Sequence, residues 1–333
     1  FCNNKEYTLK LKLKTETEYL KRMKLLYDIF CLNTMKWKTY NIPYIRKYVT
    51  LNITFDGLKQ HLYPLFLLFF NEVAFAIYVN SDITILGFLC SDKEVGVYSL
   101  SVKMYSVIKT IVNSIVVVSM PRMASYLGNN NLEEYKKLCK KVFMATLTIL
   151  IPAILGMILL SDKLLFVIAG EEYISGKWAF CILSVTLLFS VGVAFYGNCI
   201  LIVNRLEKIC LKAACLSAIL NIVLNLILIP YTGYNGAAFT TLLSEAITAI
   251  IYMKNSKQFI DKIVDKTDLI SIIFGCGGIL FVCEIFDKLR LSEDYTIVLS
   301  VLFSCIFYFT IQLILKNKIV MNSLNSVKRI HKC

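Results

Sequence analysis

Residues 142–160 read VFMATLTILIPAILGMILL, an unbroken stretch without a charged side chain. Because a helix needs about 20 apolar residues to cross the hydrocarbon core of a bilayer, this stretch predicts a membrane-spanning helix. Similar stretches fill most of the chain after residue 62. The predicted spans are 63–81, 97–120, 142–160, 178–203, 211–230, 235–253, 269–286 and 295–315. The sequence therefore predicts an all-α integral membrane protein with about eight transmembrane helices.

The basic residues between these spans alternate between crowded and sparse loops. One side of the membrane would hold the start of the chain, the loops 121–141, 204–212 and 254–268, and the tail from Lys316. This side carries 29 of the 36 Lys and Arg residues. The other side carries 5, and the remaining 2 lie inside a span. Since short cytoplasmic loops are enriched in Lys and Arg, both termini are predicted to be cytoplasmic.

The formal net charge of +13 has the same explanation. The basic residues are spread over separate loops that would face anionic lipid, so we expect no nucleic-acid partner. The 12 cysteines are dispersed and contain no CxxC pair. They are typical of small apolar residues in a membrane interior, and we predict no disulfide framework and no metal site.

Residues 1–61 form a polar, lysine-rich segment without a signal-peptide pattern. We predict a basic cytoplasmic segment close to the membrane surface. The chain starts at Phe1 rather than at Met, which predicts a fragment or a processed form of a longer protein.

Polar residues form one stripe along the predicted span 97–120. Charges inside a membrane usually face a protein interior or a water-filled cavity, because a central charge costs about 2.5–3.5 kcal/mol. Lys109 flanks the stripe near the middle of the span, so we predict that it faces a cavity. Lys103 has the alternative of extending to the outer interface. The stripe repeats at helical spacing and consists of Ser99, Lys103, Ser106, Thr110 and Asn113.

Two further stripes lie in the predicted spans 211–230 and 235–253. They line a cavity or form hydrogen bonds between helices, and the sequence leaves both roles open. The stripes consist of Ser217, Asn221 and Asn225 in the first span, and of Thr241, Ser244 and Thr248 with the adjacent Glu245 in the second.

Three other acidic residues lie in or near spans. Glu72, next to Asn71, is deepest within a predicted span, so we expect it to be paired with a lysine or protonated. Asp82 and Glu284 lie closer to the ends of their spans, where ordinary solvation is expected.

We find no catalytic constellation in the sequence. His61 and His331 are the only histidines, and no phosphate-binding loop, nucleophile elbow or paired-carboxylate motif is visible. The sequence therefore predicts a transporter rather than an enzyme, with no cofactor. Its energy would come from a gradient, from substrate supply or from removal of the product.

Several short segments resemble Wzx-type polysaccharide flippases in their order and spacing. The first group is Asp82–Gly87, Glu94–Ser99, Ser119–Arg122 and Leu132–Lys137. The second group is Gly170–Tyr173, Asn221–Pro230, Gly233–Ala238 and Ser244–Glu245. Ile83 departs from the pattern, because related flippases often have a basic residue after the aspartate.

The resemblance implies membership of the multidrug/oligosaccharidyl-lipid/polysaccharide (MOP) exporter superfamily. Such proteins have two six-helix lobes, often with two extra C-terminal helices. The implied division is an inter-lobe linker at 1–61, a second six-helix lobe of a MATE-like fold at 62–254, two additional helices at 255–315, and a cytoplasmic tail at 316–333. The first lobe would then be missing from this chain and would be a partner.

The implied function is translocation of undecaprenyl-diphosphate-linked oligosaccharide units across the bacterial inner membrane by alternating access, for surface polysaccharide such as the O-antigen of lipopolysaccharide. Other implied partners are membrane lipids and polysaccharide assembly proteins. Since lysine suits phosphate, Lys103 and Lys109 are the predicted headgroup contacts. The other predicted cavity residues are Asn113, Glu72, Asn221, Asn225 and Glu245.

Three alternatives remain. A drug or lipid exporter of the same superfamily would share these features. A truncated remnant would be inactive because half of the cavity wall is missing. A membrane glycan polymerase would need a large outer loop with Arg and His chemistry, and the longest predicted outer loop, 161–177, contains neither residue.

Overall fold

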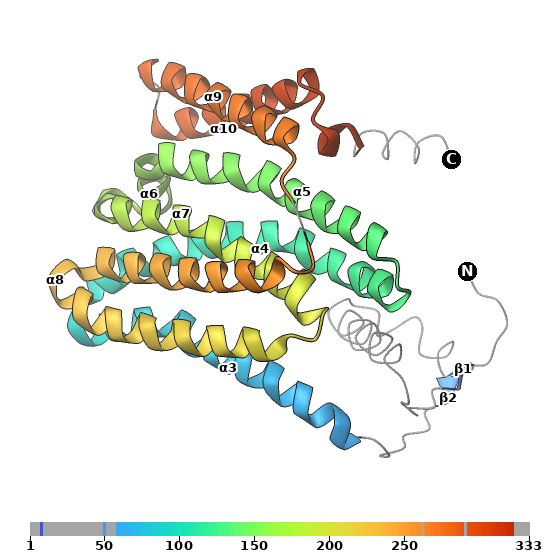
Figure 1. The fold of residues 1–333 in the computed structure, drawn as a ribbon. Coiled ribbons are helices and arrows are strands. Elements are labelled where there is room, and N and C mark those ends of the chain that lie inside the picture. Colours follow the sequence, from blue (N-terminus) through green and yellow to red (C-terminus); the bar gives the residue numbers. More distant parts are fainter. Residues whose placement is uncertain (1–6, 9–48, 51–57, 261–262, 290–291, 323–333) are drawn as a thin grey trace.

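The computed structural model describes residues 7–8, 49–50, 58–260, 263–289 and 292–322 (Figure 1). Over this part of the chain the structure is almost entirely helical, which confirms the predicted all-α class. Most of the predicted basic segment 1–61, and the end of the predicted tail 316–333, lie outside the described residues.

The helices follow one another with very short connections. Two two-residue strands, β1 (Tyr7–Thr8) and β2 (Val49–Thr50), pair in parallel. The helical elements are α3 (Leu58–Leu89), α4 (Asp92–Gly128), α5 (Leu132–Leu159), α6 (Ser161–Ala169), the 3₁₀ helix η1 (Glu171–Gly176), α7 (Lys177–Ala194), the π-helix η2 (Phe195–Ile202), α8 (Glu207–Ser256), α9 (Lys266–Lys288) and α10 (Glu293–Ile314).

Helix α4 begins at a capping box. The Ser91 side chain accepts a hydrogen bond from the Glu94 backbone N–H, and the Glu94 carboxylate accepts one from the Ser91 backbone. This pairing satisfies two N–H groups that a helix start leaves without partners. It fixes the start of the helix that carries the predicted polar stripe.

Helix α8 folds back on itself at Gly233, where the backbone has φ 54° and ψ −139°. Figure 1 shows the two limbs of α8 side by side, joined at one end of the bundle. Only glycine adopts this conformation readily, because it has no Cβ. The two predicted spans 211–230 and 235–253 therefore form one helical hairpin.

Six helices among the described residues are long and apolar enough to cross a membrane. They overlap seven of the eight predicted spans, because α8 contains two of them. The remaining predicted span, 63–81, lies in α3, where only Leu65–Ala74 forms a short apolar stretch. Polar residues such as Asn80, Ser81 and Asp82 lower the hydropathy of α3, and the count of eight stays a prediction.

Helix α3 packs mainly against α8, and α7 packs against both α8 and α4. Helices α9 and α10 pack against each other and reach the rest of the molecule through α5 and α6, at one edge of the bundle (Figure 1). A core of buried apolar side chains, including Leu86, Tyr98 and Phe180, joins α3, α4 and α7. Large apolar side chains such as Phe274 and Ile306 are exposed, as expected for a lipid-facing surface.

Candidate functional site

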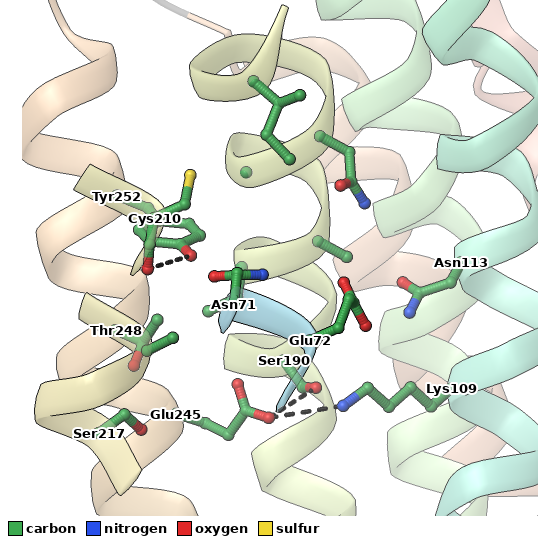
Figure 2. Close-up of a pocket in the computed structure, with 16 residues that line it drawn as sticks. Asn71, Glu72, Lys109, Asn113, Ser190, Cys210, Ser217, Glu245, Thr248 and Tyr252 are labelled. Atoms are coloured by element: carbon green, nitrogen blue, oxygen red, sulfur yellow. Dashed lines mark hydrogen bonds and ion pairs between the residues drawn. The ribbon is translucent and has the colours of Figure 1, made fainter. Parts of the chain in front are cut away.

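Two polar cavities lie between α3, α4, α7 and α8. Cavity 1 has a volume of about 220 Å³ and is lined by Asn71, Glu72, Ser190 and Asn198, among others (Figure 2). Cavity 2 has a volume of about 310 Å³ and is lined by Asp82, Tyr98 and Thr241, among others. Both cavities are lined by Lys109, Asn113 and Glu245.

Lys109 lies on α4 and points toward Glu245 on the second limb of α8 (Figure 2). Its Nζ atom lies 3.5 Å from Glu245 Oε1 and donates a hydrogen bond to the Tyr105 hydroxyl at 3.3 Å. The ammonium group also lies 5.4 Å from the centre of the Tyr105 ring, within cation–π range. The prediction that Lys109 faces a cavity agrees with this placement.

Glu245 connects three helices. Its Oε1 atom faces Lys109 on α4 and also accepts a hydrogen bond of 3.1 Å from Ser190 on α7. The Glu245 side chain is only 6% exposed, and that of Lys109 is 19% exposed. Two charges removed from water in this way need each other, because either one left alone would carry an uncompensated desolvation cost.

Two buried acceptor atoms in cavity 1 have no hydrogen-bond partner within the described part of the chain. They are Asn71 Oδ1 on α3 and Asn113 Oδ1 on α4. A buried polar atom without a partner is uncommon in a folded protein. Cavity 1 therefore offers acceptors to a ligand that carries N–H or O–H donors, or to water.

Glu72 lines cavity 1 but is exposed. The expectation that it is the most deeply buried acid is wrong, because α3 lies against α8 and has few contacts with α4. Among the described residues no ion pair joins Glu72 to a lysine. The lysine in this cavity pairs with Glu245 instead.

Asp82 is 5% exposed, so the expectation that it is solvated near an interface is also wrong. It accepts hydrogen bonds from the Tyr98 hydroxyl at 3.0 Å, from Asn225 Nδ2 at 2.6 Å and from the Thr241 hydroxyl. Donors from α4 and from both limbs of α8 thus surround one carboxylate of α3. Glu284, in contrast, is exposed and pairs with Lys288, as expected for a solvated residue.

Asn221 and Asn225 are completely buried on the first limb of α8. Asn221 Oδ1 accepts hydrogen bonds from Ser81 at 2.8 Å and from Asn225 at 3.1 Å, while Thr240 donates to Asn225 Oδ1. Neither asparagine lines cavity 1 or cavity 2. Asn225 contacts the lining of cavity 2 indirectly, through its hydrogen bond to Asp82, and it is also bonded to Thr240 on the second limb of α8.

Lys103 is exposed on α4 and lines neither of the two cavities. The structure therefore separates the two predicted headgroup contacts, which lie six positions apart on one helix. Lys109 is in the cavities, whereas a role for Lys103 stays a prediction.

The sequence did not single out Ser190, Tyr105 or the π-helix η2. Helix η2 borders cavity 1 through Gly197, Asn198 and Ile202. A Cβ atom at Gly197 would lie 2.9 Å from the Tyr252 ring, so a larger residue does not fit there. π-Helical turns occur often at functional sites, and the Gly–Asn pair inside an apolar span was the available signal.

A third cavity of about 370 Å³ is almost entirely apolar. It lies between α5 and the pair α9–α10 and is lined by Pro152, Gly156, Ile279 and Tyr308, among others. No group of His, Cys, Asp and Glu residues that could hold a metal ion is found among the described residues. Among the described residues, the three cavities together are lined by one lysine, several acids, amides and hydroxyls, and by apolar side chains.

Comparison with known proteins identifies related transporters. The sequence profile of a family described as "Lipid II flippase MurJ" matches residues 68–324. The probable low-salt glycan biosynthesis flippase Agl15 of Haloferax volcanii is 21% identical over 179 residues, which cover 54% of this chain and 38% of that protein. The capsular polysaccharide biosynthesis protein CapF of Staphylococcus aureus is 23% identical over 216 residues, which cover 63% of this chain and 54% of that protein.

Two solved structures share the fold. A lipid II flippase MurJ in an inward closed conformation has a TM-score of 0.66 at 16% identity and covers 81% of this chain and 57% of its own. An outward-facing multidrug resistance MATE family transporter of the MOP superfamily has a TM-score of 0.53 at 14% identity. The match covers 76% of this chain and 64% of that transporter. The expected MATE-like fold is confirmed, although the Wzx type is not singled out. The chain spans about half the length of the curated relatives that it matches.

Proposed function

Because this chain belongs to the lipid II flippase MurJ family, we propose that it acts in the translocation of a polyprenyl-diphosphate-linked glycan across a membrane. The relatives named as glycan or capsular polysaccharide proteins support this substrate class. The finer proposal is an undecaprenyl-diphosphate-linked oligosaccharide for surface polysaccharide, carried by a Wzx-type flippase. The protein would work as a transporter without bond-making chemistry.

The observation that carries the proposal is the placement of Lys109. A diphosphate that crosses the hydrocarbon core needs a cation, and the lysine ammonium is a compact charge that binds phosphate well. Lys109 lines both polar cavities, so it is within reach of a headgroup in either one.

The remaining parts of the substrate also find matching surroundings. Asn71 Oδ1 and Asn113 Oδ1, which have no hydrogen-bond partner among the described residues, suit the hydroxyl groups of a sugar. The polyprenyl chain needs only apolar surroundings, which the lipid and the apolar cavity beside α5 supply. One cation, free acceptors and an apolar groove together fit a lipid-linked glycan better than a purely apolar drug.

Transport by alternating access would require this lobe to rock against a second lobe around the cavities. We place the loops 121–141, 204–212 and 254–268 and both termini in the cytoplasm, and the protein in the bacterial inner membrane. The charge distribution over the loops supports this orientation. The proposed activity is that of a whole transporter, and this chain spans about half the length of the curated relatives that it matches.

Export of glycan in cells tests the proposal. In the full-length protein, K109Q should abolish export at normal expression, because the diphosphate loses its counter-charge. The matched control is K136Q, which removes a lysine from the exposed surface of α5. Equal export by K109Q and K136Q would show that Lys109 does not bind the headgroup.

A drug exporter is the second candidate, and the structural likeness to a multidrug resistance MATE transporter favours it. Deleting the gene distinguishes the two functions. Loss of surface polysaccharide supports the glycan flippase, whereas increased drug sensitivity with normal polysaccharide supports the drug exporter.

A further inference from the structure

The Lys109–Glu245 ion pair lies where the two polar cavities meet. Among the described residues, Asn113 is the one other residue that lines both cavities. The ion pair therefore lies at the boundary between the two cavities, beside a headgroup that passes from one to the other.

The cavities extend from the ion pair toward opposite ends of the bundle. Cavity 1 reaches Ile202 and Cys210, which flank the connection between η2 and α8. Cavity 2 reaches Asp82 and Tyr98, close to the connection between α3 and α4. Helices α4 and α5 and the continuous segment α7–η2 cross the bundle in alternating directions, so these two connections lie at different ends (Figure 1).

We propose that Glu245 is the resident counter-ion of Lys109 and that the anionic headgroup of the substrate displaces it. The ion pair opens when the headgroup binds and forms again when the headgroup leaves. This inference rests on the proposed function, since it requires Lys109 to bind the substrate's phosphate groups.

The geometry favours exchange over a permanent bond. The Nζ–Oε1 distance of 3.5 Å is long for a charge-assisted hydrogen bond, which is usually about 2.7–2.9 Å. A diphosphate has more charge and more acceptor atoms than one carboxylate, so it competes well for the ammonium group. Ser190 also donates a hydrogen bond to Glu245, which gives the carboxylate a second partner besides Lys109.

The ion pair also stabilises the charge of Lys109 when no substrate is bound. A lysine left alone in a buried site carries a large desolvation cost. With Glu245 present, the empty protein holds a neutral pair and returns to its starting conformation without a stranded charge. Glu245 therefore lowers the affinity for the headgroup and in exchange permits its release.

Glu284 provides the control because it is an exposed carboxylate on α9 that lines neither cavity 1 nor cavity 2. The carboxylate that forms the ion pair with Lys109 is that of Glu245. E284Q and E245Q remove the same charge, but E245Q also removes the charged partner of the lysine.

Binding of farnesyl diphosphate to the purified full-length transporter tests the inference, with farnesol as the uncharged reference. E245Q should bind farnesyl diphosphate about tenfold more tightly than the wild type, because the competing carboxylate is gone. E284Q should change the affinity by less than about threefold. K109Q should bind at least about tenfold more weakly, and farnesol binding should be the same in all four proteins.

The outcomes separate the two proposals. If K109Q loses binding but E245Q gains none, the counter-ion role is overturned and the headgroup contact stands. If K109Q binds as the wild type does, the headgroup contact in the proposed function fails. Should E245Q not fold, E245D keeps the charge and withdraws the carboxylate from Lys109. E245D must then bind more tightly than the wild type, and no gain in affinity overturns the inference.

Discussion

Asn225 on the first limb of α8 donates a hydrogen bond of 2.6 Å to Asp82 on α3, which lies 143 positions earlier in the chain. Tyr98 and Thr241 donate to the same carboxylate, so four segments of the bundle meet at Asp82. Because the carboxylate is buried, the Tyr98 hydroxyl and one N–H of Asn225 depend on it, whereas the Thr241 hydroxyl also donates to the Ala237 carbonyl.

Replacing Asp82 by Ala should destabilise the protein by at least about 2 kcal/mol, because the buried Tyr98 hydroxyl and one N–H of Asn225 lose their acceptor. The thermal unfolding midpoint of the purified protein measures this. E284A is the control, since Glu284 is an exposed acid near the end of α9 and should change the midpoint little. Equal midpoints for D82A and E284A would show that the Asp82 network does not hold the helices together.

Replacing Gly233 by Ala should destabilise the α8 hairpin by about 1–3 kcal/mol, because the backbone has φ 54° and a Cβ atom would lie 3.0 Å from Glu94 Oε1. Chemical denaturation of the purified protein measures the loss, with G277A as the matched control. Gly277 lies inside α9, where an added Cβ atom would have no neighbouring atom within 4 Å and alanine favours the helix. A G233A protein as stable as G277A would contradict the positive-φ backbone conformation at Gly233.

Asp265, just before α9, should contribute stability that depends on pH. Hydrogen bonds from Thr267, Lys318 and Lys140 hold the pKa of its carboxyl well below its usual range. A lowered pKa means that the contribution is fully present above the ordinary pKa of about 3.9 and is lost as the pH falls below it. D265N should therefore lower the unfolding midpoint at pH 7, and the difference from the wild type should shrink toward pH 3. A difference that stays constant with pH would exclude this ionic contribution.

Replacing Asn113 by Leu should reduce glycan transport without unfolding the protein. Asn113 lines both cavities and its Oδ1 atom has no partner within the described residues, so leucine removes an acceptor for the substrate at little cost to the fold. We expect a loss of about fivefold to tenfold in transport rate, equal to the loss of roughly one hydrogen bond. S114A, on a neighbouring position of α4, is the control. Unchanged transport by N113L would place the sugar elsewhere.

The helices themselves were predictable from the sequence, because long apolar stretches have few alternatives in a membrane. The polar stripe on α4 also indicated the correct side for Lys109 and Asn113, since helical periodicity fixes which side chains share a face. The hairpin of α8 could be anticipated from the break around Pro230 and Gly233 between two spans.

The partners across helices could not be predicted. Lys109 and Glu245 are 136 positions apart, and nothing in the sequence favoured Glu245 over Glu72 as the neighbour of the lysine. Asp82 looked solvated because its position near the end of a span was visible, whereas its donors on α4 and α8 were not. Periodicity describes one helix at a time, and contacts between helices depend on how the bundle packs.

The role of Lys109 can be measured as translocation in proteoliposomes that contain the full-length transporter and a fluorescent polyprenyl-diphosphate-linked oligosaccharide. Quenching by a lectin on the outside reports each substrate molecule that crosses. We predict that the wild type and K136Q flip the lipid at similar rates, while K109Q retains less than about one tenth of the rate. Flipping by K109Q at the rate of the wild type would contradict the assignment of Lys109 as the headgroup contact.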